Sequence, residues 1–284
     1  MATIELSAGT IEYQDTGTGP VLVFLHGLLM DASLWDDVIT GLSPGFRCIA
    51  PTLPLGAHHV PVRPDADLSM PAIAGLVTEF LDRLDLRDVT LVGNDTGGAL
   101  VQLIISQPSA AERVQRVVLV SCDAFDNFPP GLTGKTLFLA GRLSPAMFGV
   151  FMQQMRLRPV RRLPIAFGWL TKRGDAATAR WMRPVLTQPG IRHDTVKVLR
   201  AAAGDTGLLT RAAVGLTDFT GPALVIWASQ DRVMPPDHGR RLAGILPGSR
   251  LVQVDDSYTL IPLDQPGRLA QAIRDFSVSP SVSR

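Results

Sequence analysis

The fold is decided by the stretch Val89-Thr90-Leu91-Val92-Gly93-Asn94-Asp95-Thr96-Gly97-Gly98-Ala99-Leu100. Its apolar first half predicts a buried strand, and its second half predicts a helix. Gly93 and Gly97 flank Asp95 in the spacing Gly-x-Asp-x-Gly of a nucleophile elbow, where small residues let strand and helix approach closely. The amides and the positive dipole at the helix start would stabilise an ionised Asp95. A simple helix cap is the structural alternative for this aspartate.

On both sides of this stretch, apolar runs alternate with helical patterns. This alternation is typical of an α/β fold with a mostly parallel, twisted sheet that helices cover on both faces. The runs predicted as strands are Val21–Leu25, Phe46–Ala50, Val89–Val92, Val117–Val120, Leu224–Ala228 and Leu251–Val254, after an N-terminal hairpin of Thr3–Leu6 and Ile11–Asp15. Helices are predicted at Ser33–Thr40, Met70–Leu84, Ala99–Ser106, His238–Leu246 and Pro266–Phe276.

Composition and charge narrow the function classes. The 284 residues are 46% hydrophobic and 19% charged, so the chain can bury a large core. The net charge of +1 gives no whole-chain basic field, and we expect no nucleic-acid partner. Two cysteines, Cys48 and Cys122, form no disulfide framework and favour a reducing, cytoplasmic location. The apolar run Val21–Met30 is too short for a membrane span, so we expect no membrane partner; no motif indicates a metal or a cofactor.

The middle of the chain differs from the rest. Between residues 127 and 215 no valine-rich strand is visible, and phenylalanine, methionine, tryptophan and arginine recur at helical spacing. We therefore predict a helical insertion over residues 127–215 in a core made of residues 1–126 and 216–284. The insertion contains 14 lysines and arginines against three aspartates. Either this basic insertion sits on an acidic core with solvated outer faces, or some arginines attract an anionic ligand.

With these motifs the sequence resembles the α/β-hydrolase superfamily over nearly its whole length. Phe24-Leu25-His26-Gly27 resembles the family's oxyanion loop, Trp35 follows where an aromatic residue is common, and Pro51-Thr52-Leu53-Pro54-Leu55-Gly56 resembles the loop after the next strand. The resemblance implies that the backbone amides of Leu28 and Thr96 are the oxyanion donors, which stabilise negative charge on a substrate oxygen. It also implies that the insertion is a cap over the cleft.

The partners of the elbow aspartate are incomplete. Asp123 and Asp231 each follow a strand, at the two positions where the superfamily places its catalytic acid. After the last strand the chain reads Asp255-Asp256-Ser257-Tyr258-Thr259-Leu260-Ile261-Pro262-Leu263-Asp264-Gln265-Pro266. In this register Tyr258 stands at the family's glycine and Thr259 at its catalytic histidine. A neutral threonine is no base near pH 7.

Known aspartate-elbow branches match in scaffold and differ in detail. Haloalkane dehalogenases usually place a halide-binding tryptophan after the aspartate, and fluoroacetate dehalogenases an arginine, whereas Thr96 stands here. Epoxide hydrolases use tyrosines in the cap, and this chain has only Tyr13 and Tyr258, both outside the insertion. The chemistry of each branch is therefore incomplete in this sequence.

Two functions follow as hypotheses. The first is an enzyme that uses Asp95 as nucleophile or general base on a small, largely apolar molecule in the capped cleft. The resemblance implies hydrolysis, while elimination, isomerisation or cyclisation would need only a buried base and oxyanion donors. The second is a ligand-binding or regulatory protein that kept the cleft and lost turnover.

Substrate contacts are expected from side chains beside the motifs and from the insertion. The resemblance also implies that the histidine of the oxyanion loop supports that loop through hydrogen bonds. Aromatic and aliphatic residues of the insertion should supply much of the pocket wall, and at least some of them should face Asp95. The predicted substrate-binding residues are His26, Trp35, Phe148, Trp169 and Tyr258, and the further aromatic candidates are Phe151, Phe167 and Trp181.

Overall fold

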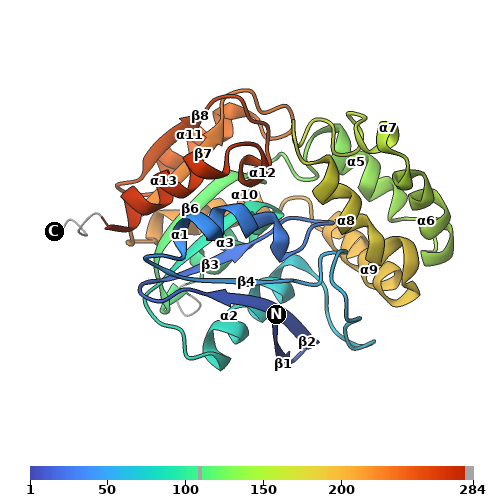
Figure 1. Ribbon diagram of the computed structural model, residues 1–284, viewed down its shortest axis with the longest axis horizontal. Helices are drawn as coiled ribbons and strands as arrows, with labels where there is room; N and C mark the ends of the chain where they lie inside the picture. The colour runs from blue at the N-terminus through green and yellow to red at the C-terminus, as the bar shows by residue number, and fades with distance from the viewer. Residues whose placement is uncertain (108–110, 279–284) are drawn as a thin grey trace.

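One mostly parallel sheet runs through the larger part of the molecule (Figure 1). The computed structural model describes residues 1–107 and 111–278, and within them the sheet has eight strands in the order β1-β2-β4-β3-β5-β6-β7-β8. Strands β1 and β2 pair antiparallel, β2 is antiparallel to β4, and all later pairs are parallel. The strands are β1 Ala2–Leu6, β2 Gly9–Thr16, β3 Val21–Leu25, β4 Arg47–Pro51, β5 Val89–Asp95, β6 Val114–Cys122, β7 Ala223–Ala228 and β8 Arg250–Val254.

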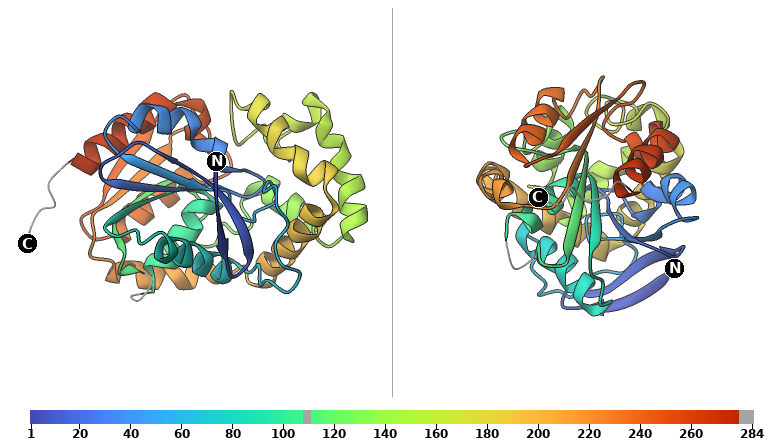
Figure 2. Two further views of the ribbon diagram at one scale, coloured as in Figure 1. Left: turned by 60° about the horizontal axis from the view of Figure 1, so that its bottom comes forward. Right: turned by 90° about the vertical axis from the view of Figure 1, so that its left-hand side faces the viewer.

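Helices cover both faces of this sheet. The helix pair α1 and α13 packs on one face, while α2, α3 and α10 pack on the other (Figure 2). Strands β5 and β7 are buried along their whole length because both of their faces are covered. The core helices are η1 Ala32–Trp35, α1 Asp36–Leu42, α2 Met70–Arg83, α3 Thr96–Ile105, α10 Leu208–Gly215, η3 Leu216–Asp218, α11 Pro236–Ile245, α12 Ile261–Asp264 and α13 Pro266–Val278. The predicted α/β-hydrolase architecture is confirmed.

The remaining helices form a lobe at the carboxyl end of the central strands (Figures 1 and 2). This helical lobe contains α5 Gly131–Ala140, α6 Pro145–Met152, η2 Gln153–Arg156, α7 Arg158–Arg161, α8 Asp175–Thr187 and α9 Pro189–Gly204. Helix α10 lies within the predicted insertion but packs against core helix α3, so the lobe ends before it. None of the helices in the described residues is long and apolar enough to cross a bilayer.

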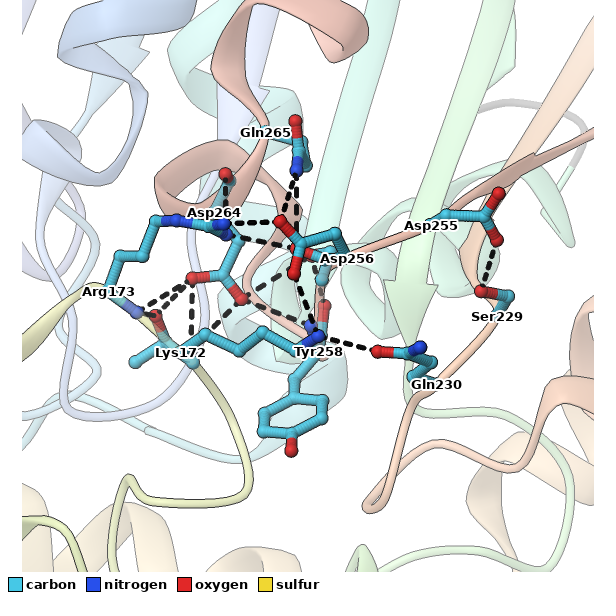
Figure 3. A network of polar contacts seen from close by, with 11 residues as sticks. Lys172, Arg173, Ser229, Gln230, Asp255, Asp256, Tyr258, Asp264 and Gln265 are labelled. Carbon is cyan, nitrogen blue, oxygen red and sulfur yellow. Dashed lines mark hydrogen bonds and ion pairs between the residues drawn. The ribbon is translucent and has the colours of Figure 1, made fainter.

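A buried carboxylate joins the lobe to the core. Asp264 accepts hydrogen bonds from the Thr171 hydroxyl at 2.7 Å and from the backbone N–H groups of Lys172 and Arg173 at 3.0 Å each. It also accepts one from the backbone N–H of Tyr258 at 3.0 Å, which lies in the loop after β8 (Figure 3). One side chain therefore fixes the lobe against the loop that carries Thr259.

Exposed ion pairs surround this carboxylate. The Lys172 ammonium lies 3.1 Å from Asp256, and Arg173 also pairs with Asp256 (Figure 3). Exposed pairs contribute only about 0–1 kcal/mol each. The buried hydrogen bonds of Asp264 are therefore the stronger part of this junction.

The elbow depends on backbones that approach without side chains between them. A Cβ on Gly97 would overlap the carbonyl oxygen of Leu25, and a Cβ on Gly93 would overlap the backbone of Gly97. Helix α3 can therefore sit directly against β3 and β5 only because these positions are glycine. This packing brings the end of β5 to the oxyanion loop.

We predict that Gly97→Ala lowers the free energy of unfolding by about 1–3 kcal/mol or more, because the new methyl group must displace main chain. Gly75→Ala is the matched control: nothing lies within 4 Å of its Cβ, and it stands at an exposed position of helix α2. It should stabilise by roughly 0.5–1 kcal/mol. Urea unfolding measures both, and equal effects of the two substitutions would contradict the packing argument.

Candidate active site

Asp95 occupies a strained turn between β5 and α3. Its backbone angles are φ 56° and ψ −130°, a conformation that side-chain-bearing residues rarely adopt and that is typical of functional sites. Its side chain makes no capping hydrogen bond to helix α3. The Asp95 carboxylate therefore does not cap helix α3, and it lies against the oxyanion loop at Gly27.

The Asp95 carboxylate lies in the position expected for an oxyanion. The backbone N–H groups of Thr96 and Leu28 are near enough to favour its charged form, and the carboxylate packs so closely on Gly27 that a Cβ there would overlap it. Burial has the larger effect and raises the pKa of Asp95 to about 6. The two amides predicted as oxyanion donors therefore hold the protein's own carboxylate.

Asp123 and Asp95 both lie near the hydroxyl group of Thr96. The Thr96 hydroxyl donates to Asp123 at 3.1 Å and lies 3.5 Å from Asp95. Burial, followed by the neighbouring charge of Asp95, raises the pKa of Asp123 well above its ordinary value. One oxygen of Asp123 is buried without a hydrogen-bond partner. Of the two carboxyl groups, Asp123 therefore has the more strongly raised pKa.

Asp231 holds the threonine that stands at the histidine position. The Thr259 hydroxyl donates to Asp231 Oδ1 at 2.8 Å, and the same oxygen accepts from the backbone N–H groups of Val233 and Met234. Burial raises the pKa of Asp231 to about 6. Its Oδ2 has no partner at normal hydrogen-bond distance, although the Ser121 hydroxyl is near enough to favour the charged form. Thr259 therefore stands beside the acid, where the family has its catalytic histidine, and its neutral hydroxyl is no base.

No described histidine replaces the missing base. His26 donates from Nδ1 to the Gly27 carbonyl at 2.9 Å and accepts at Nε2 from the Leu53 N–H at 2.8 Å, and burial lowers its pKa to about 4. It therefore supports the oxyanion loop as a neutral ring. His58 is also buried and contacts Asp194 at 3.2 Å, which ties the loop after β4 to helix α9. The remaining histidines, His59, His193 and His238, lie outside the cavity lining.

An apolar cavity of about 120 Å³ lies between Asp95 and the helical lobe. Aliphatic, methionine and phenylalanine side chains make up most of the described lining. Its polar side chains are those of Asp95, Thr96, Thr133, Thr136 and Gln154, and no lysine, arginine, histidine or tyrosine stands among the described lining residues. The cavity suits an uncharged, apolar ligand, not an anion drawn in by the arginines of the insertion.

Two of the aromatic candidates face this cavity, and the five predicted substrate contacts lie elsewhere. Phe151 and Phe167 line the cavity. Trp35 is fully buried against Phe24 with ring centroids 5.1 Å apart, and Phe148 is fully buried within the lobe. Trp169 packs against the core cluster, and His26 supports its loop. The Tyr258 ring lies under Lys172 and Arg232, at 5.0 and 4.9 Å.

Sequence reasoning missed the role of Asp264. The segment Pro262-Leu263-Asp264-Gln265-Pro266 was used only to fix the register of the loop after β8. An acidic residue between two prolines, in a segment of otherwise apolar and amide side chains, is the signal that could have found it. The insertion supplies much of the cavity wall, as expected, but Leu137 on α5 and Met155 on η2 were not singled out, because they belong to helical patterns that look like ordinary core.

The family follows from comparison with known proteins. A sequence model of the alpha/beta hydrolase fold matches residues 20–266. The chain belongs to the α/β-hydrolase fold family. Among curated relatives of this hydrolase, haloalkane dehalogenase 2 of Mycobacterium tuberculosis is 30% identical over 272 residues, covering 94% of the chain and 91% of the relative. Non-heme chloroperoxidase CPO-A1 of Kitasatospora aureofaciens is 26% identical over 255 residues, covering 85% of each.

Solved structures share the architecture. Haloalkane dehalogenase DbeA from Bradyrhizobium elkani superposes with a TM-score of 0.76 at 20% identity, covering 96% of this hydrolase and 94% of that chain. The enol-lactonase from Burkholderia xenovorans gives 0.74 at 20% identity, covering 98% and 100%. At these identities the likeness shows the fold alone. Together with the curated relatives, it makes the protein an α/β-hydrolase-type enzyme of the dehalogenase-like branch.

The raised pKa of Asp95 predicts a pH-dependent stability. Between its ordinary value of 3.8 and about 6, the native hydrolase holds a proton on Asp95 that the unfolded chain has released. The free energy of unfolding therefore falls as pH rises through this window, and above it the buried charge costs roughly 3 kcal/mol. We expect Asp95→Asn to be more stable than the parent at pH 8, with the difference shrinking at pH 4. Urea unfolding at both pH values measures this. The exposed Asp65→Asn is the control and should show no such pH-dependent difference.

Proposed function

We propose that this enzyme acts on a small, largely apolar electrophile, with Asp95 as the nucleophile. The observation that carries the proposal is the Asp95 carboxylate, held by the amides of Leu28 and Thr96 at the inner end of an apolar cavity. We further propose that the helical lobe is the cap that selects the substrate, and that the enzyme is cytoplasmic. The related dehalogenase is consistent with attack on carbon.

The amide contacts favour a nucleophile over a general base. A base that removes a proton next to a carbonyl needs free oxyanion donors for the resulting enolate. Here Asp95 occupies those donors itself. A carboxylate that attacks carbon keeps its other oxygen on the amides, so the same hydrogen bonds remain useful throughout the reaction. In the proposed reaction Asp123, whose pKa is raised further, would take up a proton before Asp95 does.

The proposed step forms an ester. A carboxylate oxygen of Asp95 attacks a saturated carbon, a carbon–oxygen bond forms, and the leaving group departs with the bonding electron pair. No described lining residue is a cation or a tryptophan that would bind the leaving anion. Good leaving groups such as iodide should therefore react faster than chloride.

Release of the ester is the weak step. Hydrolysis needs a base to activate water. Thr259 donates its hydroxyl proton to Asp231, and the described histidines lie outside the cavity lining. The covalent state should therefore be long-lived. The alternative function is a protein that binds ligand without turnover. The same hydrogen bond supports it, because it leaves Thr259 unable to act as a base.

We predict that incubation with 1-iodohexane gives a covalent adduct on the peptide that contains Asp95. Intact-protein and peptide mass spectrometry would detect the added hexyl group, and 1-chlorohexane should react more slowly. Asp95→Asn should form no adduct, because an amide is a poor nucleophile. Asp123→Asn removes a neighbouring carboxylate and should still allow the adduct.

The other outcomes are equally clear. An adduct that survives Asp95→Asn contradicts the assigned nucleophile. Turnover that depends on Asp95 without any adduct would favour the general-base mechanism. Thermal stabilisation by apolar ligands, with neither adduct nor product, would favour the ligand-binding function.

We predict that Thr259→His restores ester release. The new imidazole would stand beside Asp231 at the family's histidine position, and general-base catalysis typically contributes about 10²–10⁴-fold. Loss of the hexyl adduct, followed by mass spectrometry, should accelerate at least about tenfold. Thr259→Val removes the hydroxyl without adding a base and is the matched control. Equal acceleration by both variants would mean that water access, not the missing base, limits release.

A further inference from the structure

Exposed apolar side chains gather on one part of the helical lobe. Among the described residues, twelve large hydrophobic side chains are exposed, and eight of them fall between positions 132 and 165. The most exposed are Val150 at 76% and Leu139 at 63%. A soluble surface scatters such residues singly, whereas a cluster marks an interaction site. We call this surface the lobe face, residues 132–165.

Five of these side chains lie on helices α5 and α6. On α5, Leu132, Lys135 and Leu139 follow one another at spacings of three and four residues, so they share a face. On α6, Val150 and Phe151 lie three and four residues after Met147, so both are its neighbours on the helix surface. Helix α6 lies at the edge of the lobe remote from the sheet, whereas α5 lies nearer to the core (Figure 1).

The charge of the lobe face has one sign. Residues 132–165 contain six lysines and arginines and no aspartate or glutamate. Arg158 and Arg161 pair with Asp175 from α8, just beyond the face. Lys135, Arg142 and Arg162 are exposed, and no carboxylate of the described residues pairs with them. The face therefore combines protruding apolar side chains with uncompensated positive charge.

The apolar cavity opens on the same face. Phe151, Leu163 and Ile165 line the cavity and are also exposed to solvent, at 37%, 43% and 43%. Gln154 is a further exposed lining residue. A ligand that enters beside these side chains reaches Asp95 along apolar walls.

We propose that the lobe face docks on the surface of an anionic lipid bilayer. Apolar side chains would enter the boundary between headgroups and acyl chains, while the basic side chains contact lipid phosphates. An apolar molecule dissolved in the bilayer could then pass into the cavity without crossing water. The contact is peripheral, since no described helix is able to span the bilayer. It departs from the expectation of no membrane partner drawn from the sequence.

Charge complementarity selects lipid over a second copy of the chain. In a two-fold dimer the same patch meets itself, which would place these cations opposite one another. An anionic bilayer offers negative charge over the whole face, and its interior accepts side chains that protrude singly. An acidic protein would satisfy the cations but would need pockets shaped for each apolar side chain.

Vesicle flotation tests the proposal without reference to catalysis. The full-length enzyme should float with vesicles of equimolar phosphatidylcholine and phosphatidylglycerol, and not with phosphatidylcholine alone. High salt should weaken binding, because screening acts on exposed charges. Each basic residue at an anionic surface is worth roughly fivefold in partition, so Lys135→Glu/Arg142→Glu should weaken binding by at least about 25-fold. Leu139→Gln/Val150→Asn should also weaken it.

Matched controls lie on the core. Val214 is 75% exposed on α10, and Arg240 is exposed on α11. Val214→Asn and Arg240→Glu should leave flotation unchanged. No flotation with anionic vesicles, or equal losses in lobe and core variants, overturns the proposal. A dimer seen by light scattering that the lobe variants dissociate, without vesicle binding, would assign the face to a second copy and also overturn it.

Discussion

The contact between the Asp95 carboxylate and the oxyanion loop is the interaction on which the rest of the site depends. It requires Gly93 and Gly97 to let helix α3 close on β3 and β5, and Gly27 to leave room for the carboxylate itself. The strained backbone of Asp95 is held by this surrounding packing. Because the carboxylate then fills the amides of the loop, the fold itself restricts the chemistry: an oxygen of the protein, not of the substrate, is stabilised there.

Three buried carboxylates share this site, no lysine or arginine stands among the described residues that line the cavity, and two threonines donate hydrogen bonds to the carboxylates. Thr96 connects Asp95 to Asp123, while Thr259 satisfies one oxygen of Asp231. Burial raises the pKa of all three carboxyl groups, and the charge of a neighbouring carboxylate adds to the rise for Asp95 and Asp123. The pKa of Asp123 is raised furthest, and burial is the main cause. In the proposed reaction neither threonine would bind the leaving group or activate water, so attack would be better prepared than release.

The strands, the elbow and the position of Thr259 beside an acid were predictable, because each depends on local pattern or on register along one segment. The cavity wall was not. Phe148 and Phe151 are three residues apart on α6, yet the first is buried inside the lobe and the second lines the cavity. Helical periodicity cannot separate these outcomes when α6 is apolar on most of its circumference. Trp35 shows the same limit: an aromatic residue at a family position serves the core. Helix α10 was assigned to the insertion because nothing in its own sequence shows that it packs on α3.

The apolar lining acts on the two half-reactions in opposite directions. Removing water from around Asp95 strips the carboxylate of solvent and strengthens its interaction with a bound electrophile. The same exclusion keeps water from the ester that results. In related enzymes a histidine overcomes this by holding and activating one water molecule; here Thr259 and Asp231 satisfy each other instead. In the proposed mechanism an apolar cavity lining and a missing base would reinforce one another, and both would favour a covalent state that persists. An enzyme built this way depends on how its apolar ligand arrives more than on how fast the product leaves, which gives the exposed apolar rim of the cavity its importance.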